Sequence, residues 1–88
     1  MLRLEMERHA LVQADRDIAE GEARIERQRR LIRHILAEGR DIGEALVLLG
    51  LLNETLMTWR AHRDEIVKTI ARLEGAQPKA GDETDRCA

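Results

Sequence analysis

Aromatic residues are almost absent from this 88-residue chain, which has no Phe, no Tyr and one tryptophan, Trp59. Aromatic side chains anchor most β-sandwiches and most sites that stack nucleotides or bases, so their scarcity argues against these classes. Serine is absent too, the threonines have no consistent general base near them, and no glycine-rich phosphate loop occurs. We therefore expect no enzymatic activity, no catalytic residue and no bound cofactor.

Cysteine and long apolar runs are equally scarce. Cys87 is the only cysteine and cannot form an intrachain disulfide, which fits a reducing, cytoplasmic compartment. The first ten residues carry charges every few positions, unlike a signal peptide. The longest apolar run, from Ala45 to Leu52, is interrupted by Gly50 and is far too short to span a bilayer. We expect a cytoplasmic protein without membrane contact.

Metal-binding patterns are missing as well. The three histidines, His9, His34 and His62, are far apart in the sequence, and none follows a glutamate by three positions as in di-iron bundles. We expect no metal site. The net charge of −2 implies no particular partner, whereas 36% charged and 43% hydrophobic residues are typical of long amphipathic helices.

An apolar residue recurs every seven positions over the first 35 residues, at Leu4, Leu11, Ile18, Ile25 and Ile32. This spacing is typical of a helix that packs along another helix. Three positions after each of them lie Glu7, Ala14, Gly21, Gln28 and Ile35. The small Ala14 and Gly21 would let a second helix approach closely, and we interpret Gln28 as a device that sets the register between helices.

A second helix is predicted to follow the first almost at once. Gly39 is a natural C-terminal cap, and Asp41 with Glu44 has the form of a capping box. A connection this short forces the two helices to pack antiparallel. The seven-residue repeat then resumes at Ala45, Leu52, Trp59, Ile66 and Leu73, reinforced by Leu49, Leu56 and Ile70. Paired positions should have numbers that sum to roughly 80, which places Ile25 near Leu56.

The predicted fold is all-α, a coiled-coil-like antiparallel hairpin over residues 1–75. Its helices cover about 3–38 and 42–74, its turn covers 39–41, and the polar residues 76–88 form a flexible tail. If the helices open at Gly39 and exchange between chains, the same apolar positions would form a swapped dimer. The sequence leaves these two connectivities open.

Surplus hydrophobic residues lie around the turn. The segment from Ala45 to Leu52 spreads leucine and valine around nearly the whole helix, more than one neighbouring helix can cover. The predicted interface consists of Leu31, Leu36, Leu46, Val47, Leu51 and Met57. Two hairpins joined through it would form a four-helix-bundle dimer. The favoured function is a cytoplasmic interaction module that self-associates and serves as a scaffold or regulator.

Two other functions stay open. The same surface would suit an adaptor that binds a helix of another protein. Nucleic-acid binding through the arginines between Arg24 and Arg33 is less favoured, because these side chains wind around the helix. Glu20 and Glu26, each four residues before an arginine, would also neutralise part of the charge.

Residues 8–68 carry a resemblance to a known group. The segments IAEGEARIERQRRLI, EGRD and EALVLLGLLNETLMTWRAHRDEI resemble short helical-hairpin proteins of alphaproteobacteria. The resemblance implies a helix, a glycine turn and a leucine-rich helix. It implies no activity, and it transfers no catalytic residue.

Overall fold

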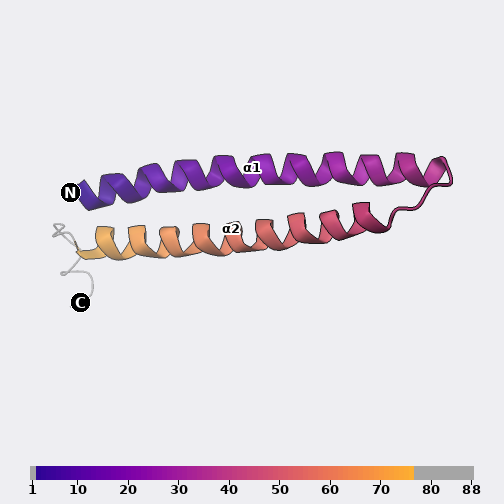
Figure 1. The fold of residues 1–88 in the computed structure, drawn as a ribbon. Coiled ribbons are helices and arrows are strands. Elements are labelled where there is room, and N and C mark those ends of the chain that lie inside the picture. The colour runs from indigo at the N-terminus through magenta and orange to yellow at the C-terminus, as the bar shows by residue number, and fades with distance from the viewer. Residues whose placement is uncertain (1, 77–88) are drawn as a thin grey trace, which may run out of the picture.

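The chain folds as two long helices joined by a short turn. The computed structural model describes residues 2–76, in which α1 spans Leu2–Ala37 and α2 spans Gly43–Ala76. The helices run antiparallel, side by side and in contact (Figure 1). The predicted all-α antiparallel hairpin is thus confirmed. The rest of the predicted tail, residues 77–88 with Cys87, lies outside the described residues.

The hairpin is a single layer of helices. Its Cα trace measures 67 Å in length and 14 Å in thickness. Within residues 2–76, no other element covers the outward faces of α1 and α2. Side chains that point away from the neighbouring helix are therefore exposed to solvent, whatever their polarity.

The turn is held by caps on both helices. Gly39 adopts a left-handed conformation with φ +74°. The Gly39 N–H donates to the Leu36 carbonyl at 2.9 Å and the Arg40 N–H to the Ile35 carbonyl at 3.1 Å, the two bonds of a Schellman motif. Asp41 Oδ1 accepts a hydrogen bond from the Gly43 N–H at 3.1 Å. Within residues 2–76 we find no reciprocal bond from the Glu44 carboxylate, so half of the predicted capping box forms.

Replacing Gly39 by alanine should lower the free energy of unfolding by about 1–2 kcal/mol, because an L-residue is strained at this positive φ. Urea denaturation followed by circular dichroism would measure it. Gly75→Ala is the matched control, since Gly75 lies in α2 with no atom near its added Cβ and should lose no stability. Equal stability of the two variants would contradict the assigned cap.

The core is a single line of side chains between the helices. Its buried apolar members are Leu4, Ala14, Ile25, Ile32, Leu56 and Ile66, all positions of the two seven-residue repeats or their neighbours. None of the described side chains is completely buried. A core this thin leaves the hairpin with a small margin of stability.

Buried contacts fix the register of the two helices. Gly21 lies against the side chains of Leu56 and Trp59, close to the predicted pairing. The buried Gln28 amide donates from Nε2 to the Ala45 carbonyl at 2.9 Å. The bond satisfies the buried amide in the observed register and holds Gln28 of α1 against the first turns of α2.

Candidate interaction surface

All six residues of the predicted interface lie at the surface. Leu31, Leu36, Leu46, Val47, Leu51 and Met57 are between 46% and 69% exposed, and Leu48 is 46% exposed. Together these seven residues expose on the order of 700 Å² of surface, distributed over several faces of the hairpin. They all lie in the turn half of the hairpin, which we define as residues 24–37 of α1 and 43–58 of α2.

The beginning of α2 explains why these side chains stay uncovered. Consecutive apolar side chains point in all directions around α2, and α1 covers only one face of that helix. Ala45, Leu49 and Leu52 face α1 and are half-buried. Leu46 and Leu48 fall on opposite sides of this contact, and Val47 points away from it.

One side of the hairpin, which we call the bridged flank, is closed by ion pairs between the helices. Seven-residue spacing aligns positions 8, 15, 22, 29 and 36 of α1 opposite positions 46, 53, 60, 67 and 74 of α2. Three bridges cross this flank, Arg8 with Glu74 at 2.7 Å, Arg60 with Glu22 at 2.7 Å and Arg63 with Asp15 at 2.5 Å. These pairs are exposed, so each adds little stability.

Arg63 occupies a position that faces α1 but carries a charged head group. Its hydrogen bond to Asp15, reinforced by the charge of that carboxylate, raises the pKa of Arg63 above its ordinary value. The aliphatic stem of Arg63 can lie along the apolar contact while the charge reaches solvent.

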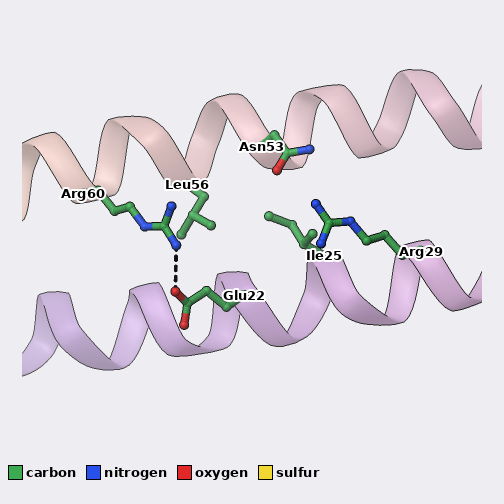
Figure 2. Close-up of a pocket in the computed structure, with 6 residues that line it drawn as sticks. All are labelled: Glu22, Ile25, Arg29, Asn53, Leu56 and Arg60. Atoms are coloured by element: carbon green, nitrogen blue, oxygen red, sulfur yellow. Dashed lines mark hydrogen bonds and ion pairs between the residues drawn. The ribbon is translucent and has the colours of Figure 1, made fainter.

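A shallow groove opens on the bridged flank, a feature that the sequence patterns do not reveal. It encloses about 170 Å³ and is lined by Glu22, Ile25, Arg29, Asn53, Leu56 and Arg60. Figure 2 shows the ion pair between Glu22 and Arg60 across the groove, with Arg29 near its other end. Asn53 Nδ2 donates to the Leu49 carbonyl of its own helix at 3.1 Å. Arg29 has no ion-pair partner in the described part of the chain.

The opposite side, which we call the unbridged flank, has a different character. Positions 10, 17, 24 and 31 of α1 lie along it, followed by position 38 in the turn, opposite positions 48, 55, 62 and 69 of α2. Among residues 2–76, no ion pair crosses this flank, and the Gln28 bond to the Ala45 carbonyl lies buried beneath it. Leu31 and Leu48 supply its apolar surface in the turn half, and Leu51 lies beside them.

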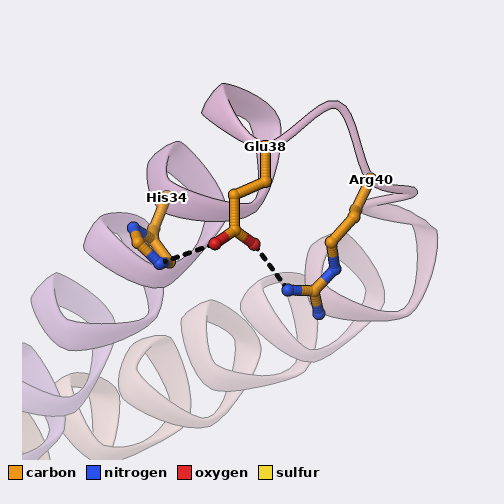
Figure 3. Close-up of polar contacts among 3 residues, drawn as sticks. All are labelled: His34, Glu38 and Arg40. Carbon is orange, nitrogen blue, oxygen red and sulfur yellow. Dashed lines mark hydrogen bonds and ion pairs between the residues drawn. The ribbon is translucent and has the colours of Figure 1, made fainter.

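A small polar cluster lies at the turn end of α1. The Glu38 carboxylate lies 3.2 Å from His34 Nε2 and accepts a hydrogen bond from the Arg40 guanidinium at 2.6 Å (Figure 3). All three side chains are exposed. A carboxylate has room for further donors beyond these two, because its two oxygens offer about four acceptor sites.

The arginines of α1 do not form one basic face. Arg30 and Arg33 lie 3.8 Å from the Glu26 carboxylate, as expected for the first of them. The expected pair between Glu20 and Arg24 does not form in the described structure. Arg24 has no carboxylate partner within residues 2–76, although it lies in the middle of the unbridged flank.

Other site types find no support in the described structure. Within residues 2–76, no three His, Cys, Asp or Glu side chains lie close enough to hold a metal ion. Neither α1 nor α2 combines the length and the hydropathy needed to cross a membrane.

Comparisons with protein-family models, curated proteins and solved structures give no match. Membership of the alphaproteobacterial group therefore stays a prediction, and function has to be argued from the surface of the hairpin.

Proposed function

We propose that this chain is a non-catalytic interaction module that self-associates through the turn half of its hairpin into a four-helix-bundle dimer. The observation that carries the proposal is the exposed apolar surface of Leu31, Leu46, Val47, Leu48 and Leu51. A second hairpin laid against one flank would remove part of it from water. Such a dimer would serve in the cytoplasm as a small scaffold or regulator.

The size of the exposed surface supports this proposal. A standard interface buries about 800 Å² on each partner, of which the exposed apolar residues of one flank would supply roughly 300 Å². Burial of apolar surface contributes roughly 25 cal/mol per Å², which has to exceed the cost of association. The thin core of the single hairpin would also gain a second packed side.

The mass of the 10.1 kDa chain in solution tests the proposal. Light scattering after size exclusion should give twice the monomer mass at micromolar concentration. Leu51→Asp should weaken association at least tenfold, because it buries an unpaired charge in the interface. Val12→Asp is the matched control, since Val12 is 51% exposed, as Leu51 is at 54%, but lies outside the turn half. A monomeric wild type would refute self-association.

A second function, an adaptor for a helix of another protein, is favoured by the two-sided distribution of the apolar residues. Leu36, Leu46 and Met57 lie on the side of the bridged flank, so a dimer formed through the other flank leaves them exposed. An amphipathic helix could lay its apolar face along them. Co-purification of one stoichiometric partner from the native host would support the adaptor, whereas recovery of the chain alone would count against it.

A further inference from the structure

The unbridged flank has a charge pattern that complements itself. Arg24 and Leu31 lie in one row along α1 at an interval of seven residues. Glu38, the residue just after the end of α1, continues this row because its N–H still donates to the His34 carbonyl at 3.2 Å. A two-fold axis through Leu31, perpendicular to the helices, would place Leu31 against its own copy. The same axis would place each Arg24 level with Glu38 of the other chain. An interface between two identical chains requires such self-complementarity.

The second helix fits the same axis. Gly21 lies against Leu56 and Trp59, and Glu22 pairs with Arg60, so facing residues have numbers that sum to between 77 and 82. Leu31 is therefore level with the segment from Leu46 to Leu51, which contains Leu48 and Leu51. The axis therefore passes between these two leucines. Leu48 of one chain would face Leu51 of the other, and the reverse, so both helices contribute apolar contacts around the axis.

We propose that a second copy of this chain packs on the unbridged flank, antiparallel to the first, with the turn halves overlapping and the open ends pointing in opposite directions. The inference rests on the proposed self-association and assigns its flank and its direction. The arginine without a partner, Arg24, would be paired by the Glu38 carboxylate of the second copy, which keeps acceptor sites beside its bonds to His34 and Arg40.

Charge argues against the other arrangements. The same two-fold operation on the bridged flank would bring Arg29 and Arg33 of one chain against the same arginines of the other. Packing along the full bridged flank would also desolvate its three ion pairs, which is costly. On the unbridged flank, a copy with its turn at the same end would place Glu38 beside Asp41 of the second chain. Only the opposite-end arrangement pairs Arg24 with a carboxylate.

A charge exchange tests the inference. Arg24→Glu and Glu38→Arg should each weaken dimerisation at least tenfold, because each places like charges across the axis. The double variant should restore the dissociation constant to within a few-fold of wild type. Within one chain the two positions are about 21 Å apart along α1, so the rescue cannot come from an intrachain pair. Arg29→Glu is the matched control on the bridged flank and should leave the dissociation constant unchanged.

A distance measurement gives an independent reading of direction. A spin label on Val12→Cys in a Cys87→Ser chain should give an interchain distance of about 57 Å for the opposite-end dimer. A same-end dimer would give roughly 20 Å, since only the width of the bundle separates the labels. Circular dichroism would confirm that each variant keeps its helices.

The outcomes separate the two proposals. A wild type that is monomeric overturns self-association itself. If the wild type is dimeric, self-association stands, and three results would overturn the assigned flank or direction. These are a double variant that does not regain dimerisation, an Arg29→Glu variant that dissociates as readily as Arg24→Glu, and spin labels that lie near 20 Å apart.

Discussion

Replacing Leu56 by alanine should lower the free energy of unfolding by about 2–5 kcal/mol. Leu56 is 5% exposed, contacts α1 at Gly21 and lies at the floor of the groove beside Ile25. The core is one line of side chains, so no neighbouring layer can collapse into the cavity that alanine leaves. Because domains of this size gain only about 3–5 kcal/mol from their core, much of the variant should be unfolded at 37 °C. Urea denaturation followed by circular dichroism would measure the loss.

Leu46→Ala is the control for this prediction. Leu46 is also a leucine of α2, but it is 48% exposed and lies on the bridged flank, outside the contact assigned to the second copy. Its truncation should therefore change the free energy of unfolding by no more than about 0.5 kcal/mol. Both variants have to be measured at the same protein concentration, because association adds to apparent stability. Equal losses for the two variants would show that Leu56 does not lie in the core and that the register is wrong.

The hairpin could be predicted from the sequence because its signals are local or strictly periodic. The seven-residue repeat marks the face of each helix that packs, and the burial of Ile25, Ile32 and Leu56 agrees with it. Gly39 ends α1 with the expected cap, and α1 ends at Ala37, one residue before its predicted end. Neither signal depends on contacts between distant parts of the chain.

The expected pair of Glu26 with Arg30 within α1 is present at 3.8 Å, but the ion pairs between the helices could not be predicted in the same way. The sequence pattern suggests a pair between Glu20 and Arg24 on one helix, whereas the structure pairs Glu22 with Arg60 and Arg8 with Glu74 across the helices. A long side chain can reach several positions on the facing helix, so the partner depends on the exact register and helix separation. The groove beside Ile25 depends on the same separation, and so does the difference between the two flanks.

The location of the surplus apolar surface, in contrast, follows from the order of the residues in the sequence alone. A helix that carries five leucines or valines between residues 46 and 51 exposes some of them beside any single partner helix. The surface that covers these side chains belongs to another chain, so the sequence of one hairpin does not identify it. The sequence therefore indicates where the hairpin interacts, while the charges around Leu31 and their places in the structure are needed to argue for a second copy.

Gly21→Leu should lower the free energy of unfolding by about 1–3 kcal/mol, because the two helices are too close here to accept a side chain. An added Cβ would lie 3.3 Å from Leu56 Cδ1 and 3.5 Å from the Trp59 ring. Alanine gains about 1 kcal/mol in helix propensity over glycine but has to displace Leu56 slightly, so we expect Gly21→Ala to be nearly neutral. The further carbons of leucine have no space between the helices, and they would push apart the neighbouring ion pair of Glu22 with Arg60.

Gly50→Leu separates this packing effect from the effect on helix propensity. Gly50 also lies inside a helix, but nothing lies within 4 Å of its added Cβ. Leucine there should therefore raise the free energy of unfolding by up to about 1 kcal/mol. The two substitutions are chemically identical, but their changes in the free energy of unfolding should have opposite signs. Urea titrations at matched protein concentration would measure both changes. If both variants are stabilised, α1 and α2 do not approach at Gly21, and the close contact in the middle of the hairpin is not present in solution.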